Sequence, residues 1–223
     1  MSRKLLTGVA LAASTLVWAS AALLATSSAY ANPFELRLSE SGYSTQTVVG
    51  FTPGVSYSGS FGTFTVSIDG GISTTLPQID LGSTDLSTST PGLLTIELSE
   101  TGLLSPAGLT QWLTQLSIND SDPGSSVSLE SAVDLTNTIF GTGTPLSTLS
   151  SASSFIGLSG TAGADISTTP YALTLVMTVN SAGGGTFSLD GSLQPVPEPA
   201  SLTLLGTALV GLGWLGRRRR KQV

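Results

Sequence analysis

The side chains best suited to chemistry in this sequence are its aspartates and glutamates, because the chain contains no His and no Cys. The lack of His removes the usual general base near neutral pH, and the lack of Cys removes thiolate nucleophiles and thiolate metal sites. A glycosidase needs only two carboxyl groups at a defined separation. Glu97 with Glu100, and Asp80 with Asp85, are candidate pairs, although nothing around them in the sequence places either pair beside a substrate.

A group of oxygen ligands lies in residues 119–124, which read Asn-Asp-Ser-Asp-Pro-Gly. Calcium takes six to eight oxygen ligands, so Asp120 and Asp122 are candidate residues for a calcium site. The spacing matches no EF-hand loop, and a turn whose Asn and Asp side chains bond their own backbone explains the same residues. The turn is the preferred interpretation, so the sequence predicts no bound metal and no cofactor.

Aromatic rings, which often form flat platforms in carbohydrate-binding proteins, are few in this chain. Between residues 32 and 196, Trp112 is the one Trp, and Tyr43, Tyr57 and Tyr171 are the three Tyr. We expect these residues in the core or at strand edges, where their apolar area is buried. The sequence therefore permits a sugar-binding role without indicating one.

The elements that must position all these residues are β-strands. Several runs alternate apolar with polar residues, which is typical of strands with one buried face. Asp69-Gly70-Gly71 predicts a tight turn, and the glycine-rich residues 180–185 predict a hairpin loop. Short strands between clusters of Gly, Pro, Asn and Asp predict an all-β fold, an antiparallel β-sandwich. The apolar positions of the alternating runs are Phe34, Leu36 and Leu38; Phe64, Val66 and Ile68; Leu94, Ile96 and Leu98; Val127 and Leu129; Tyr171, Leu173, Leu175, Met177 and Val179; and Phe187 and Leu189.

One segment departs from this pattern. Ser105-Pro106 resembles a helix N-cap followed by a first-turn proline. Leu109, Trp112, Leu113 and Leu116 then recur at helical spacing. The sequence therefore predicts one short helix lying on the sandwich.

Residues 1–31 have the three parts of a secretory signal peptide. Arg3 and Lys4 are followed by a Leu- and Ala-rich segment, and the small residues Ala29 and Ala31 form a signal peptidase site that predicts cleavage before Asn32. The alternative is an uncleaved membrane anchor, because the apolar stretch is long for a signal peptide. With either interpretation the chain is exported.

Charge is distributed very unevenly. Residues 32–196 hold thirteen of the fourteen acidic residues but only Arg37 of the eight basic ones, which gives this 165-residue part a net charge near −12. A surface with one cation cannot neutralise phosphates, so nucleic acid is excluded as a partner. Divalent cations and basic polymers stay open as partners. The length suffices for one core, which must hold together without disulfides.

The C-terminal residues 195–223 have three parts in a fixed order. Pro197, Glu198 and Pro199 come first, residues 200–216 form an apolar run without charges, and a basic tail follows at residues 217–221. Seventeen helical residues span roughly 25 Å, slightly less than a hydrocarbon core of about 30 Å. The run predicts a transmembrane helix whose basic end stays in the cytoplasm, with a buried core helix as the alternative. The tail consists of Arg217, Arg218, Arg219, Arg220 and Lys221.

These three parts resemble the PEP-CTERM sorting signal of Gram-negative bacteria. The resemblance covers about thirty residues, from Val196-Pro197-Glu198-Pro199 through the Leu- and Gly-rich run to the Arg cluster. It implies recognition by an exosortase, a membrane-embedded enzyme similar to cysteine transpeptidases. It also implies cleavage near the Pro-Glu-Pro triplet and release to the cell surface or extracellular matrix.

Together these observations predict a signal peptide (1–31), a β-sandwich (32–194) and a sorting signal (195–223). The predicted protein is non-enzymatic and is held briefly in the inner membrane before it reaches the bacterial surface or exopolysaccharide matrix. Its predicted partners are signal peptidase, exosortase, the inner membrane and exopolysaccharide. The alternatives are a surface polysaccharide-active enzyme that uses Asp and Glu, and a calcium-dependent adhesive or carbohydrate-binding module.

Overall fold

The computed structural model describes residues 33–51, 53–72 and 77–196, which form twelve antiparallel strands and no helix. No helix that could cross a membrane therefore occurs in the described part of the chain. The predicted signal peptide, the Pro-Glu-Pro triplet, the apolar run and the basic tail lie outside the described residues. The strands are β1 (Pro33–Glu40), β2 (Gln46–Phe51), β3 (Gly54–Phe61), β4 (Phe64–Ile72), β5 (Ile79–Thr88), β6 (Gly92–Leu103), β7 (Gly108–Asp120), β8 (Ser126–Asp134), β9 (Thr144–Ser151), β10 (Phe155–Ile166), β11 (Tyr171–Ser181) and β12 (Gly185–Pro195).

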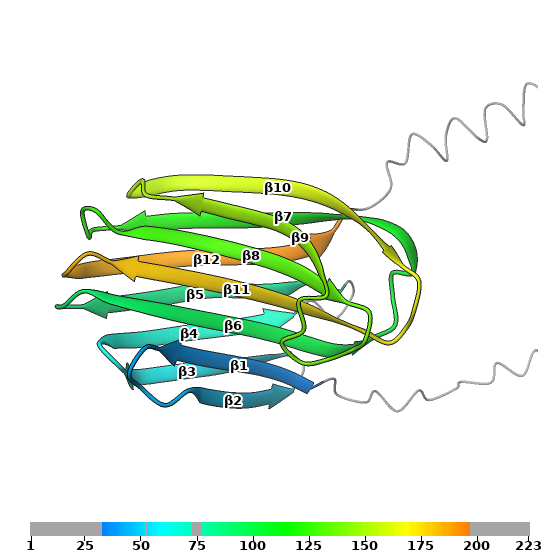
Figure 1. Cartoon of the computed structure of the whole chain (residues 1–223), viewed down its shortest axis with the longest axis horizontal. Coiled ribbons are helices and arrows are strands. Elements are labelled where there is room, and N and C mark those ends of the chain that lie inside the picture. The colour runs from blue at the N-terminus through cyan, green and yellow to red at the C-terminus, as the bar shows by residue number, and fades with distance from the viewer. Residues whose placement is uncertain (1–32, 52, 73–76, 197–223) are drawn as a thin grey trace, which may run out of the picture. The chain divides into compact units, whose positions relative to one another are not determined.

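The strands form two layers that face each other, as Figure 1 shows. One layer runs β3-β4-β5-β12-β7-β10 and the other runs β2-β1-β6-β11-β8-β9. The two are joined where β2 meets β3 through the single pair Phe51 and Gly54. This arrangement confirms the predicted antiparallel β-sandwich.

The core lies between the layers and is built from the alternating runs seen in the sequence. All of their apolar positions are at most 2% exposed, with Leu36, Ile96 and Leu175 at 0%. Polar neighbours such as Arg37 and Glu97 point to the outer face, because successive side chains of a strand face opposite ways. The period of two thus identified these particular strands, β1, β4, β6, β8, β11 and β12, correctly.

The predicted tight turn at residues 69–71 is wrong, because these residues lie inside β4. Gly70 pairs with Val55 of β3, and a Cβ atom placed on Gly70 would lie 3.1 Å from the side chain of Leu98. Gly70 thus allows a close approach between the two layers and does not form a turn.

The predicted hairpin around residues 180–185 is also wrong. β11 pairs with β6 and β8, whereas β12 pairs with β5 and β7. The glycine-rich connection therefore crosses from one layer to the other. Gly183 and Gly184 adopt φ angles of +145° and +141°, which side-chain-bearing residues rarely adopt.

The predicted short helix is wrong as well, since residues 108–120 form β7, a strand of thirteen residues. The inward positions of β7 are Thr110, Trp112, Thr114, Leu116 and Ile118, all of which are buried. The inner face carries two threonines and the outer face carries Leu109 and Leu113. The apolar residues of this strand therefore do not alternate with polar ones, and their spacing resembles that of a helix.

Candidate functional site

The strand that leads into the C-terminal segment is an inner strand of its layer. β12 lies between β5 and β7, and its Leu193 pairs with Ile79 on one side and with Thr114 on the other. Pro195 pairs with Trp112, and the Val196 amide donates a hydrogen bond of 2.7 Å to the Gln111 carbonyl. The folded structure therefore continues to the residue directly before Pro197.

Two buried aromatic rings stabilise this end of the sandwich. Trp112 and Tyr171 are fully buried and meet edge to face, with ring centroids 6.4 Å apart. The Tyr171 hydroxyl donates a 2.6 Å hydrogen bond to the Ser105 carbonyl and so fixes the loop between β6 and β7. Burial, with the nearby Glu100 carboxylate, raises the pKa of Tyr171, so the phenol stays protonated. Both rings lie in the core, as expected, and cannot form a sugar platform.

Both carboxylates of the candidate calcium loop accept hydrogen bonds from protein groups, Asp120 within the loop and Asp122 from Ser181 and Ala182. Asp120 Oδ1 accepts a 2.5 Å hydrogen bond from the Asp122 amide, and Asp120 Oδ2 accepts one from the Ser125 hydroxyl. Asp122 is only 3% exposed, and its Oδ2 accepts hydrogen bonds from the Ser181 hydroxyl at 2.5 Å and the Ala182 amide at 3.1 Å.

These contacts have two consequences for the loop 119–124. The Ser181 hydroxyl and the nearby backbone amides lower the pKa of Asp122, which keeps the carboxylate charged. The same contacts tie the loop between β7 and β8 to the crossing between β11 and β12. Within residues 33–51, 53–72 and 77–196, no three His, Cys, Asp or Glu side chains gather as they would around a metal ion.

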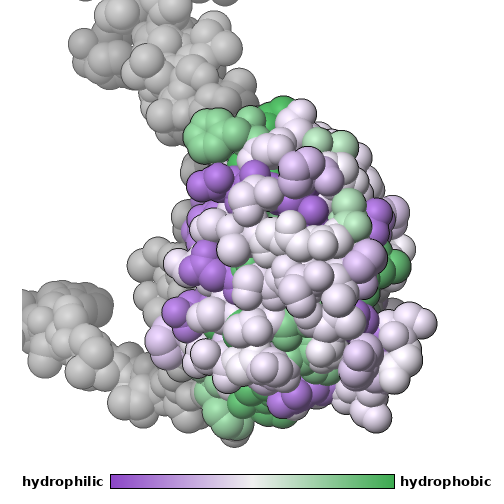
Figure 2. Space-filling view, turned by 90° about the vertical axis from the view of Figure 1, so that its left-hand side faces the viewer, coloured by the Kyte–Doolittle hydropathy of each residue, from purple (hydrophilic) through white to green (hydrophobic). Residues whose placement is uncertain are grey.

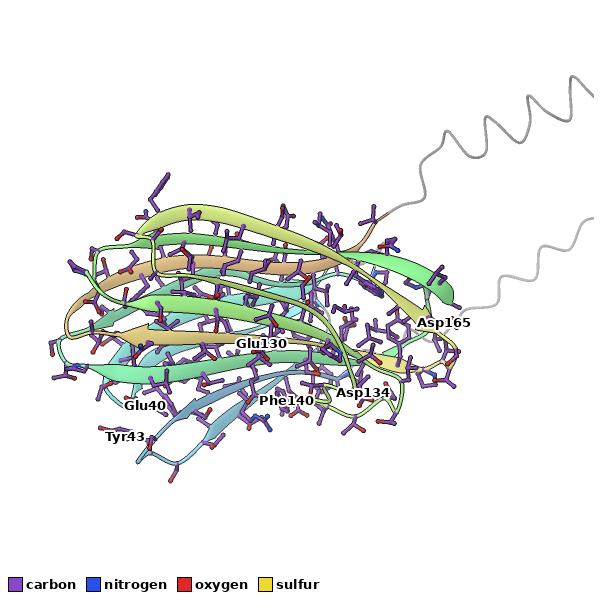
Figure 3. All side chains as sticks on the ribbon, turned by 45° about the horizontal axis from the view of Figure 1, so that its top comes forward. Glu40, Tyr43, Glu130, Asp134, Phe140 and Asp165 are labelled. Atoms are coloured by element: carbon purple, nitrogen blue, oxygen red, sulfur yellow. The ribbon has the colours of Figure 1, made fainter. Side chains whose placement is uncertain are left out.

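Glu97 and Glu100, one candidate catalytic pair, do not share a surface. Glu97 lies on the outer face of β6 in an ion pair with Arg37, whose guanidinium also lies 4.0 Å from the centre of the Phe140 ring. Glu100 is 1% exposed and faces the interior. Residues three apart on a strand face opposite ways, so these carboxyl groups cannot act on one substrate. Figure 3 labels Phe140 in the loop that covers this outer face.

Asp80 and Asp85, the other pair, lie on β5 in different surroundings. Asp85 is exposed, whereas Asp80 is partly buried in an open groove of about 470 Å³ beside Gly82. Among the described residues, Asp80 Oδ1 has no hydrogen-bond partner. Burial, together with the charge of Asp190, raises the pKa of Asp80 to about 6. Asp190 could not be recognised as a neighbour from its position in the chain, because the two residues come together only through the pairing of β5 with β12.

Replacing Asp80 with Asn is expected to stabilise the protein near pH 7. The raised pKa means that Asp80 favours the folded state fully below the unfolded pKa near 4 and loses this contribution as the pH rises through about 6. The difference of about two pKa units corresponds to roughly 3 kcal/mol, which solvent screening at this partly exposed site reduces to about 1–2 kcal/mol. Denaturant unfolding at pH 4 and pH 7 measures the effect.

Asp85→Asn is the matched control, since it removes the same charge from an exposed position of the same strand. The advantage of Asp80→Asn over the wild type should be small at pH 4 and appear at pH 7, while Asp85→Asn should change little. An equal response of both variants to pH would contradict the assignment.

Short polar side chains line a second groove, of about 450 Å³, on the layer that contains β4, β5 and β12. Their hydroxyl, amide and carboxylate groups can exchange hydrogen bonds with a hydroxyl-rich polymer. Among the described residues that line this groove, Phe187 is the one aromatic residue, and it is only 1% exposed. The polar side chains are Ser58, Thr65, Ser67, Asp85, Ser87, Asn119, Ser121, Thr186 and Ser188.

A family model of the PEP-CTERM protein-sorting motif matches residues 195–220. The match starts at Pro195, the last residue of β12, and extends to Arg220. The chain therefore carries a PEP-CTERM sorting motif, which confirms the resemblance seen in the sequence. Such a motif implies export and sorting through the membrane to the cell surface.

No curated protein matches the chain. Among solved structures, the chain is similar to TmCBM61 in complex with β-1,4-galactotriose (10% identity, 62% of this chain and 92% of the other, TM-score 0.36). It is also similar to a CBM6 of the laminarinase LamC of Zobellia galactanivorans (11%, 63% and 98%, 0.28). A third is the epithelial adhesin 6 A domain of Candida glabrata in complex with Galβ1-3GlcNAc (10%, 76% and 82%, 0.32). Likenesses of this size identify no ligand for this chain.

Proposed function

We propose that this chain, which carries a PEP-CTERM sorting motif, is a non-enzymatic acidic β-sandwich of the bacterial surface or exopolysaccharide matrix. Signal peptidase removes residues 1–31, and the apolar run 200–216 then holds the protein in the inner membrane. An exosortase cuts near Pro197, Glu198 and Pro199 and releases the sandwich. The observation that supports this most is that strand pairing and hydrogen bonding continue as far as Val196, the residue directly before the triplet.

The order of the three parts gives each a distinct role. Proline lacks the amide hydrogen of a strand or helix interior, so Pro197 and Pro199 favour extended backbone between sandwich and membrane. The five cations at residues 217–221 hold the other end of the run in the cytoplasm. Residues up to Val196 are paired with β7, so a protease can reach the bonds after Val196 without opening the sheet.

The surface of the sandwich suits a hydrated matrix. A net charge near −12 in residues 32–196 keeps copies of the protein apart and soluble. The groove of Ser, Thr, Asn and Asp side chains offers hydrogen bonds to exopolysaccharide hydroxyls. Any such binding would depend on hydrogen bonds rather than on stacking, because none of the described residues lining the groove exposes an aromatic ring.

The alternative, a polysaccharide-active enzyme, is favoured by one observation. Asp80 has a pKa raised to about 6 and lies near Asp190, and a protonated carboxyl beside a charged one is the arrangement that glycosidases use. Assays of Asp80→Asn and Asp190→Asn against a panel of polysaccharides separate the two functions. Turnover by the wild type that both variants lose would support the enzyme, and its absence in the wild type supports the non-enzymatic protein.

Replacing Arg217, Arg218, Arg219 and Arg220 with Gln is expected to misplace the protein or release it prematurely. The neutral variant lacks most of the charge that keeps its C-terminus in the cytoplasm. Fractionation into membrane, surface and medium, followed by immunoblotting, measures the change. Replacing the same residues with Lys keeps the charge and should preserve the wild-type distribution. If the Gln variant also fractionates like the wild type, the basic tail has no anchoring role.

A further inference from the structure

Apolar side chains are exposed at the end of the sandwich where β12 ends. Leu104, in the loop after β6, is 70% exposed, and Leu109, near the start of β7, is 77% exposed. Val196 is 38% exposed and bonds to Gln111, two residues from Leu109. Leu109 pairs with Asp165, which Figure 3 labels at this end, opposite the end with Tyr43.

These side chains are held by ordered backbone. The loop of Leu104 is fixed through the hydrogen bond from Tyr171 to the carbonyl of Ser105. Leu109 belongs to the β7–β10 ladder, where its backbone pairs with that of Asp165. The backbone at this end of the sandwich is therefore ordered, and the apolar side chains of Leu104 and Leu109 stay exposed to water unless a partner covers them.

The length of chain outside the structure determines what lies next to this end. Only residues 197–199 separate Val196 from the apolar run that begins at Ala200. Four Cα steps of at most about 3.6 Å span about 14 Å. The headgroup region on each side of a bilayer occupies about 5–8 Å of that distance. If the run spans the membrane, the end of the sandwich must lie at the headgroups.

Electrostatic attraction does not provide this contact. Arg37 is the one cation among residues 33–196, and it is occupied by Glu97. Asp165 adds a negative charge beside Leu109. Contact with lipid at this end therefore depends on the short tether and on apolar side chains, and should be insensitive to salt.

We infer that, before cleavage, the sandwich rests on the outer surface of the inner membrane with Leu104 and Leu109 in contact with lipid. This contact holds the Pro-Glu-Pro triplet at the membrane surface, where a membrane-embedded exosortase can reach it. The inference rests on the proposed function, because it requires residues 200–216 to be in the membrane.

Single-cysteine labelling tests the inference cleanly, because the chain has no native Cys. The Leu104→Cys and Leu109→Cys variants of the full chain are each labelled at the new cysteine with the environment-sensitive fluorophore NBD. The labelled proteins are then reconstituted in phosphatidylcholine vesicles. Phe155→Cys is the matched control, since Phe155 is 84% exposed at the start of β10, at the opposite end. Figure 2 shows that opposite end of the sandwich, which is mostly polar or weakly polar with apolar side chains at its margins.

The expected result is a blue shift of NBD emission at positions 104 and 109, with quenching by lipids that carry a spin label near the headgroup, and neither effect at position 155. Raising the salt concentration should leave the quenching unchanged. Resistance to alkaline carbonate extraction reports separately whether the tail is inserted. Water-like emission at all three positions in a carbonate-resistant chain overturns the inference alone. Extraction by carbonate overturns the membrane anchor and the inference with it.

Discussion

A chain shortened to residues 32–190 is expected to lose its cooperative fold, whereas a chain of residues 32–196 is expected to fold. Residues 191–195 form the end of an inner strand that pairs with β5 and β7, and Leu193 is fully buried. Loss of the Leu193 side chain costs about 2–5 kcal/mol, and each lost backbone hydrogen bond costs about 1 kcal/mol. The sum is on the order of 5–10 kcal/mol, comparable with the stability of a whole domain.

Circular dichroism and denaturant unfolding of the two chains measure this difference. The longer chain is the matched control, because it lacks the whole membrane segment and keeps every residue of β12. If the 32–190 chain unfolded cooperatively at the same denaturant midpoint as the 32–196 chain, residues 191–195 would not be needed for the fold. That result would show that a protease could cut inside β12 without unfolding the product.

Replacing Asp122 with Ala is expected to destabilise the sandwich by about 2–4 kcal/mol, because a buried charged hydrogen-bond acceptor is lost. The Asp122 carboxylate accepts hydrogen bonds from the Ser181 hydroxyl and the Ala182 amide. Ser181 is itself 2% exposed and would be left without this partner. Denaturant unfolding at pH 7 measures the loss, and exposed Asp165→Ala, which removes the same charge, should change stability by less than about 0.5 kcal/mol.

The effect of Asp122 should depend on pH in a defined direction. Its pKa is lowered in the folded state, so its contribution is present above the unfolded pKa near 4 and is lost as the pH falls below that value. In acid, the free energy of unfolding of the wild type should therefore approach that of an Asp122→Asn variant, which carries no charge at this position. If Asp122 were instead a calcium ligand, millimolar calcium would raise the melting temperature of the wild type and not that of Asp122→Ala. We expect no such rise, because the Ser181 hydroxyl and the Ala182 amide already donate hydrogen bonds to the Asp122 carboxylate.

Strands were predictable from the sequence where the inner face carried only large apolar residues. Phe34, Leu36 and Leu38 show the pattern clearly, and all three are fully buried. β7 was missed because its inner face includes Thr110 and Thr114, while Leu109 is exposed. Burial of these threonines between two layers depends on the tertiary fold, which local periodicity does not record.

The incorrect predictions of a turn at residues 69–71 and of a hairpin at residues 180–185 have a related cause. Glycines 70 and 71 permit close packing inside β4, and Gly183 and Gly184 permit a crossing between layers. The sequence shows where glycine is needed but not which strand the chain will join next. The path of a loop depends on the pairing partners of the whole sheet.

The candidate sites divide in the same way. The sorting motif was recognisable because it is a linear signal, with its triplet, apolar run and basic tail in order along the chain. The proximity of Asp190 to Asp80 arises from the pairing of β5 with β12 and could not be read from spacing. The opposite facing of Glu97 and Glu100, by contrast, follows from their spacing of three once the segment is known to be a strand.

The proposed function requires the C-terminal segment to be a temporary membrane tether that is removed after Val196. Intact mass spectrometry of the protein recovered from the medium or the cell surface shows whether this removal takes place. We expect a chain that starts at Asn32, retains Val196 and lacks the apolar run and the cluster Arg217–Arg220. Chains found free outside the cell with the arginine cluster still attached, or ending before Val196, would contradict it.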